Sequence, residues 1–204
     1  KISPDEERNM IFSLIIAMLV SLSLAFAREY SDSTVRSISE LQNRQLTILA
    51  LIPSIGKGYR YQKNRYQTIG NAEKIQRRMI TQEDPKSPVS EAYRSLRTSL
   101  IYSNINNTGN VILISSPGPG EGKTTTIVNL AITYANLGKK TVLLDTDLRK
   151  PVVHNVFGID REPGVSKIIS SNMDNYDQVV RGTNIKNLNV INAGVIPPNP
   201  SEML

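Results

Sequence analysis

The chain has 204 residues, with 24 Lys and Arg against 18 Asp and Glu for a net charge of +6, and it contains no cysteine. This length accommodates one medium-sized domain with additional segments, and the lack of cysteine excludes disulfides and thiolate metal sites. Because the chain opens at Lys1 without methionine and stops at Leu204 in what reads as the start of a helix, we expect a fragment of a longer protein.

Residues 10–27 form an uncharged apolar run, MIFSLIIAMLVSLSLAFA. A helix of this length reaches about 27 Å, close to the roughly 30 Å hydrocarbon core of a bilayer, so we predict a transmembrane helix. The alternative is a secretory signal peptide, since AFA before Arg28 fits a small-x-small cleavage pattern. Residues 1–9 carry three acids and two bases, however, and a signal peptide begins with a positive segment.

The charges that flank the apolar run predict its orientation. Basic residues accumulate after Arg28, so the positive-inside rule places the C-terminal side in the cytoplasm. Residues 1–9 are then the extracytoplasmic end. We interpret residues 28–56 as a cytoplasmic juxtamembrane segment, with a short helix in SISELQNRQL and a strand in TILALIP.

Residues 57–86 are polar and basic, which is typical of a linker. Between residues 57 and 78 the basic side chains outnumber the single acid Glu73; they are Lys57, Arg60, Lys63, Arg65, Lys74, Arg77 and Arg78. Such a run fits a solvated linker, an anionic lipid surface or a nucleic acid. The neighbouring span favours the linker, with membrane lipid as the next interpretation, and we expect no nucleic-acid partner.

Residues 87–204 are predicted to form the globular domain, which begins with a helix. Ser87 is a capping residue, and Pro88 suits the first helical position, where its missing N–H is not needed. Glu91, Arg94 and Arg97 follow at steps of three along one ridge of this helix. The spacing favours a solvated face with an ion pair, and a self-association surface is the alternative.

The segment NVILISSPGPGEGKTTTIVNLA predicts a strand at Val111–Ile114, a glycine loop and a helix. This order is typical of a P-loop, in which Lys123 reaches the β- and γ-phosphates of ATP and the Thr124 hydroxyl holds Mg²⁺. The candidate phosphate-binding residues are Gly118, Pro119, Gly120, Glu121, Gly122, Lys123, Thr124 and Thr125.

A dinucleotide-binding loop is the competing interpretation of these glycines. The general P-loop pattern has glycine five residues before Gly122, where this chain has Pro117. A dinucleotide fingerprint, in turn, requires glycine three residues after Gly120, where this chain has Lys123. A lysine followed by three threonines favours phosphate and metal binding, and hence the P-loop.

The segment TVLLDTDLRKP predicts a second strand that ends in Asp145, with Asp147 two residues later. The carboxyl ends of parallel strands meet at one edge of the sheet, so both carboxylates are expected near the phosphate loop. A carboxylate there suits holding Mg²⁺ through water or accepting a proton from an incoming hydroxyl, and the pair suits these two roles near one metal. The alternative is an acidic turn capped by Arg149 and Lys150. The predicted fold class is α/β: a P-loop NTPase domain with a mostly parallel sheet, incomplete in this chain and preceded by one transmembrane helix.

These motifs together resemble a known family. VILISSPGPGEGKTTTIVNLA, VLLDTDLRKP and GVIPPNPSEML are similar to the phosphate loop, acidic motif and downstream loop of bacterial tyrosine kinases of polysaccharide export. EAYRSLR matches their E-x-x-R-x-x-R element. The span followed by YSDSTVRS and LALIP resembles the cytoplasmic exit of the polysaccharide co-polymerase that is fused to such kinases.

The resemblance implies ATP-dependent autophosphorylation on tyrosine, with Lys123, Asp145 and Asp147 as catalytic residues and with Thr124 and Asp145 on Mg²⁺. It also implies a homo-oligomeric ring bridged by Glu91, Arg94 and Arg97, and control of capsule or exopolysaccharide length together with the polymerase and export machinery. The family's Walker B strand and tyrosine cluster are expected after Leu204, and its first span and periplasmic region before Lys1.

Two other functions are compatible with a P-loop beside a membrane span. One is a P-loop ATPase of the partition and cell-division type, although such proteins carry a signature lysine at the position of Gly118. The other is a polysaccharide chain-length regulator that binds ATP without catalysis.

Overall fold

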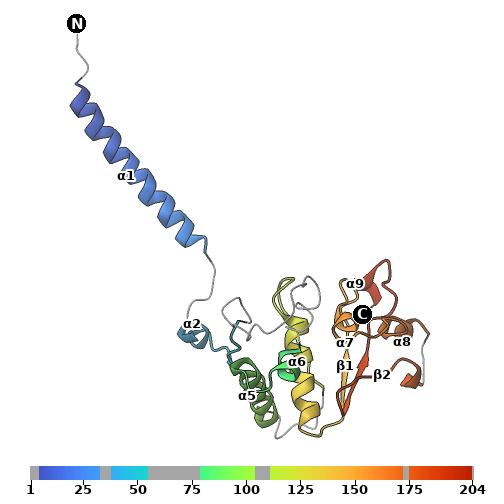
Figure 1. Ribbon diagram of the computed structural model, residues 1–204. Helices are drawn as coiled ribbons and strands as arrows, with labels where there is room; N and C mark the ends of the chain where they lie inside the picture. Colours follow the sequence, from blue (N-terminus) through green and yellow to red (C-terminus); the bar gives the residue numbers. More distant parts are fainter. Residues whose placement is uncertain (1–4, 33–37, 55–78, 104–110, 172–174, 204) are drawn as a thin grey trace, which may run out of the picture. The chain divides into compact units, whose positions relative to one another are not determined.

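The computed structural model describes residues 5–32, 38–54, 79–103, 111–171 and 175–203 (Figure 1). The chain divides into two compact units, residues 1–48 and residues 49–204. The basic run of residues 57–78 lies outside the described residues, so the interpretation of that run as a linker stays a prediction.

The first unit holds α1 (Glu6–Tyr30) and α2 (Ile38–Asn43). α1 contains the predicted helix of residues 10–27 and continues beyond it at both ends. Among the described residues it is the one helix that is long and apolar enough to cross a membrane. Its 25 residues correspond to about 37 Å, which exceeds the roughly 30 Å that a span requires.

The second unit begins with the short helix α4 (Ile80–Glu83) and the longer α5 (Pro88–Ser103). Ser87 caps α5 as predicted, since its Oγ accepts a hydrogen bond from the Ser90 N–H at 3.1 Å. Ile80, Val89 and Tyr93 form a small apolar cluster, against which Ile52 packs.

The prediction of a strand in TILALIP is wrong, because residues 47–53 have no regular secondary structure. A strand requires a hydrogen-bonded neighbour, and none pairs with this segment in the described part of the chain. The apolar side chains are accommodated by packing, as the contact of Ile52 with the α4–α5 cluster shows.

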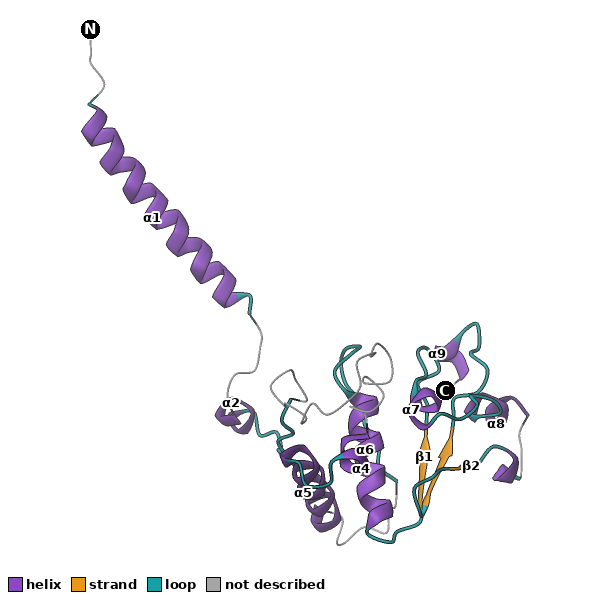
Figure 2. Ribbon diagram, viewed as in Figure 1, coloured by secondary structure: helices purple, strands orange, loops and turns teal. Residues whose placement is uncertain are grey.

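A small mixed sheet follows α6 (Lys123–Asn136) in the chain. It has the order β1-β3-β2, with strands β1 (Thr141–Leu144), β2 (Arg181–Gly182) and β3 (Leu188–Ile191). β1 and β3 pair in parallel, with Thr141 opposite Leu188, whereas β2 pairs with β3 antiparallel (Figure 2). The remaining elements are α7 (Val153–Phe157), α8 (Val165–Ser171), the 3₁₀ turn η2 (Tyr176–Gln178) and α9 (Pro200–Met203).

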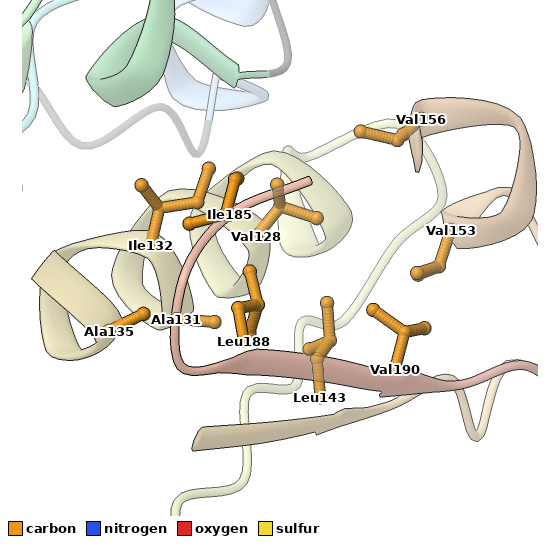
Figure 3. Close-up of a cluster of buried hydrophobic side chains, with 10 residues drawn as sticks. All are labelled: Val128, Ala131, Ile132, Ala135, Leu143, Val153, Val156, Ile185, Leu188 and Val190. Carbon is orange, nitrogen blue, oxygen red and sulfur yellow. The ribbon is translucent and has the colours of Figure 1, made fainter. Parts of the chain in front are cut away.

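The main core lies between α6 and the sheet (Figure 3). Val128 and Ile132 of α6 are fully buried, and Leu143 and Val190 of the strands face the same cluster. The other members are Ala131, Ala135, Val153, Val156, Ile185 and Leu188. This burial fixes α6 on the sheet, and with it the loop that precedes α6.

The strand predicted at Val111–Ile114 is not formed. Residues 111–116 have no regular secondary structure, and Val111 and Leu113 are 91% and 83% exposed. A buried parallel strand needs partners on its hydrogen-bonding edges, and β1, β2 and β3 pair without this segment. The apolar residues 111–114 have the propensity for a strand, but no strand of the described sheet pairs with them.

Replacement of the core residue Leu188 tests this packing. Leu188 is 1% exposed on the central strand, so Leu188→Ala should lower the free energy of unfolding by about 3 kcal/mol through lost burial and a cavity. Denaturant titration followed by circular dichroism measures this change. Leu137→Ala, at a residue 49% exposed after α6, is the control and should change it by less than about 1 kcal/mol. Equal losses would contradict the proposed core.

Candidate functional site

The glycine loop ends where α6 begins. Gly120 and Gly122 have φ values of +80° and +93°, a backbone region that other residues rarely adopt. Gly122 is the N-cap residue of α6, and its carbonyl accepts the first helical hydrogen bond from Thr126 N at 2.8 Å. The unpaired N–H groups and positive dipole end of a 14-residue helix thus begin at the loop.

Lys123 folds back over the loop that precedes it. Its Nζ donates to Ser116 Oγ at 3.2 Å and to the Gly118 carbonyl at 3.1 Å. Ser116 Oγ also donates to the Gly118 carbonyl, at 2.9 Å. In the part of the chain that the structure describes, no ion pair joins Lys123 to a carboxylate. The ammonium group is therefore aimed at the loop and has no fixed anionic partner there.

Ser116 is a site residue that the sequence analysis missed. The signal available was its position two residues before Gly118 in SSPGPGEGK, within reach of a turn. The other predicted loop residues lie on the turn or on the first turn of α6. Pro119, Gly120 and Glu121 are exposed, and Gly122, Lys123, Thr124 and Thr125 are partly buried.

Asp145 directly follows β1, as predicted, and its N–H donates to the Ile191 carbonyl of β3 at 2.9 Å. Its side chain is buried, at 5% exposure. Oδ1 accepts from Asp147 N and Oδ2 from Val153 N, both at 3.2 Å. Burial raises the pKa of this carboxyl, and the backbone donors Val153 and Asp147 oppose that rise.

Asp147 closes the turn that follows. Its Oδ1 accepts from Lys150 N at 3.0 Å and from Arg149 N at 3.3 Å. These hydrogen bonds form the turn without deciding its role, and the Asp147 N–H joins the turn to Asp145 Oδ1. Among the described residues, neither aspartate forms an ion pair with Lys123, so the loop and the turn are each held by their own hydrogen bonds.

The oxygen donors fit a magnesium nucleotide. Mg²⁺ prefers hard oxygen ligands and is usually held by one or two carboxylates together with substrate phosphates. Within the described residues no group of three metal-ligating side chains gathers. A hydroxyl from Thr124 and a carboxylate from Asp145 are the side chains that would suit such an ion, together with phosphate groups at the loop and Lys123.

The charged ridge on α5 divides into two parts. Glu91 and Arg94 form an ion pair, and Arg94 Nη2 donates to the Pro85 carbonyl at 2.6 Å. Arg97 instead reaches α6, where its Nη1 donates to the Thr133 carbonyl at 2.9 Å. That carbonyl belongs to the last turn of α6, where a cation is favourable. Arg97 therefore has an intrachain role in this structure, whereas Glu91 is exposed.

The raised pKa of Asp145 predicts a pH-dependent stability. A carboxyl whose folded pKa exceeds its unfolded value, near 4, stabilises the fold below the unfolded pKa, and this contribution is lost as pH rises through the folded pKa. Asp145→Asn replaces the titrating carboxyl with a neutral amide, so the variant does not lose stability in this way as pH rises. The unfolding free energy of the variant minus that of wild type should thus increase as pH rises from about 4 in EDTA, measured by urea titration. A constant or falling difference would contradict the assignment.

Comparisons with known proteins point to one kind of domain. Residues 112–200 match the CobQ/CobB/MinD/ParA nucleotide binding domain. Tyrosine-protein kinase YwqD of Bacillus subtilis is 40% identical over 131 residues, which are 64% of this chain and 55% of that protein. Tyrosine-protein kinase etk of Escherichia coli K12 is 27% identical over 209 residues, covering 100% of this chain and 28% of that protein.

A solved structure agrees with these relatives. The kinase domain of Escherichia coli tyrosine kinase ETK superimposes with a TM-score of 0.70 at 29% identity, covering 84% of this chain and 65% of that one. The chain thus spans only part of the proteins that it matches. The phosphate loop, the acidic turn and these likenesses confirm the resemblance drawn from the motifs: the chain is similar to the P-loop nucleotide-binding domain of bacterial tyrosine kinases.

Proposed function

We propose that the chain is part of a membrane-anchored, ATP-dependent protein tyrosine autokinase that regulates the chain length and export of a capsule or exopolysaccharide. The observation that carries the proposal is the lysine of the glycine loop. Its ammonium lies within hydrogen-bond distance of the loop carbonyl at Gly118, at the start of a helix whose N–H groups suit phosphate. The similarity to proteins named tyrosine kinases supports transfer of the phosphoryl group to tyrosine.

Each residue of the site has a role in such a transfer. The Lys123 ammonium would exchange its contacts with Ser116 and Gly118 for the terminal phosphates and neutralise their charge. Mg²⁺, when bound, supplies charge neutralisation across the phosphate oxygens. Asp145, whose pKa is raised by burial, is suited to accept the proton of the attacking tyrosine hydroxyl, and Asp147 holds the turn that presents it.

The apolar helix α1 supports a location in the bacterial inner membrane, with residues 49–204 on the cytoplasmic side where ATP is present. In this arrangement the partners are other copies of the chain, the polysaccharide polymerase and export machinery, and membrane lipid near the basic run. Transfer between copies requires tyrosines of one copy to reach the phosphate loop of another.

Substitution of the loop lysine tests the activity. Lys123→Ala in the protein that contains this chain should lower incorporation of γ-phosphate from labelled ATP into tyrosine by about 100-fold or more, since a charge contact to the transferred phosphoryl is lost. Lys139→Ala is the matched control, because Lys139 is an exposed lysine just after the same helix. Phosphoamino-acid analysis identifies the labelled residue.

The same assay separates the competing functions. Release of phosphate to water without phosphotyrosine would indicate a P-loop ATPase, a possibility that the match to the MinD/ParA domain supports. Polymer length that survives Asp145→Ala in cells would indicate a non-catalytic chain-length regulator. Unchanged tyrosine labelling in Lys123→Ala would overturn the site.

The charged ridge on α5 is proposed to contact a neighbouring copy through Glu91 and Arg94. Glu91→Arg places two like charges at an i,i+3 spacing and removes the anion from an exposed surface. We expect a smaller oligomer by sedimentation velocity at physiological salt, with unchanged far-UV circular dichroism. Glu83→Arg, on α4, is the control. An oligomer of unchanged size in Glu91→Arg would contradict an interface at this ridge.

A further inference from the structure

Asn129 is a fully buried polar residue on α6 that the proposed chemistry does not use. Its side chain makes contacts in two directions. Nδ2 donates to the Thr125 carbonyl at 2.7 Å, within the first turn of α6 where the phosphate loop ends. Oδ1 accepts hydrogen bonds from a different part of the chain. An amide buried in this way is costly unless it is paired, so its partners restrict where α6 lies.

The partner of Oδ1 is Thr81 of α4, 48 residues earlier in the chain. Thr81 donates twice, from its backbone N at 2.9 Å and from Oγ1 at 2.8 Å. Thr81 is 4% exposed, so water does not compete for these hydrogen bonds. One side-chain amide therefore connects α4 to the carbonyl of Thr125, which is itself one of the predicted phosphate-binding residues.

α4 is in turn joined to the start of α5. Ser90 Oγ donates to the Asp84 carbonyl at 2.6 Å and to the Ile80 carbonyl at 3.3 Å. Arg94, on the charged ridge, donates to the Pro85 carbonyl between the two helices. These hydrogen bonds, together with the backbone of residues 80–85, connect the ridge through α4 and Asn129 to the first turn of α6.

A second contact joins α5 to that same turn. Tyr93, 2% exposed, shares a side-chain hydrogen bond with Thr126 of α6. The opposite face of α6 packs on the sheet through apolar contacts, which have no comparable directional preference. The orientation of the first turn is consequently set by polar contacts from α4 and α5.

We propose that Asn129 and Thr81 are positioning residues, which hold the first turn of α6 in its nucleotide-binding arrangement and connect it to α4 and to the charged ridge of α5. This inference rests on the proposed nucleotide site. Without the Thr81 hydroxyl, the turn is less ordered in the nucleotide-free protein. Nucleotide binding must then supply that order, which lowers affinity.

The test uses Thr81→Val in the protein that contains this chain, in detergent or nanodiscs. Valine keeps the shape and the backbone donor but removes one buried hydrogen bond. We expect the Kd for Mg-ATP, measured by calorimetry, to rise about fivefold. Amide hydrogen exchange of residues 126–129 should quicken in the nucleotide-free protein. Thr81→Ser, which keeps the hydroxyl, should retain most of the affinity.

Thr133→Val is the matched control. Thr133 is buried to a similar degree, at 3% exposure, but among the described residues its hydroxyl bonds within its own helix, to the Leu130 carbonyl at 2.7 Å. Both valine variants lose one buried hydroxyl, so both should lower the melting temperature by a similar amount. Only Thr81→Val should change nucleotide affinity and the exchange of the first turn.

The outcomes distinguish this inference from the proposed function. If wild type does not bind Mg-ATP, the nucleotide site itself is wrong. If wild type binds and Thr81→Val binds equally well, or if Thr133→Val weakens binding as much, the positioning role is overturned. Weaker binding in Thr81→Val with rescue by Thr81→Ser supports it.

Discussion

The arrangement of the second unit depends on α6 being held from two sides by interactions of different kinds. Val128 and Ile132 bury one face of the helix against the sheet, and this apolar contact supplies most of the stabilisation. Asn129 hydrogen-bonds across to Thr81 on another side. The apolar face fixes where the helix lies, and the buried amide restricts how it is turned. The apolar face and the buried amide together position the phosphate loop, because the loop ends where this helix begins.

The loop and the acidic turn are each held by hydrogen bonds among their own residues. Lys123 bonds to Ser116 and Gly118, and the two aspartates accept backbone N–H groups from their own turn. Such local satisfaction keeps charged groups from being buried unpaired. It also means that a bound nucleotide would exchange existing hydrogen bonds of Lys123 for new ones, so that the free-energy gain is a difference between two sets of contacts.

Arg97 illustrates how one residue can serve the fold while its neighbours stay on the surface. The ridge of Glu91, Arg94 and Arg97 appears uniform in the sequence. In the structure Arg97 donates a hydrogen bond to the Thr133 carbonyl in the last turn of α6. Glu91 and Arg94 pair with each other instead, and Arg94 donates to the Pro85 carbonyl. Any energetic coupling between a contact at the ridge and a bound nucleotide would therefore pass through α5, which carries the ridge, and through α4, which contacts both α5 and α6.

Local sequence accounts for the features that depend on neighbouring residues. The glycine loop, the cap at Ser87, the apolar helix α1 and the strand that begins at Thr141 all follow from local propensity and spacing. These features also carried the resemblance to tyrosine kinases, because a phosphate loop needs a fixed local spacing. The aspartates were placed at the end of β1 on the same basis.

Features that need a distant partner depend instead on how the helices and strands pack together. Val111–Ile114 and TILALIP are apolar enough for strands, yet a strand forms only where another edge accepts its hydrogen bonds, and the described sheet provides none. The contacts of Thr81 with Asn129 and of Arg97 with Thr133 join residues 48 and 36 positions apart. No local pattern encodes such pairs, because they exist only once α4, α5 and α6 have packed together.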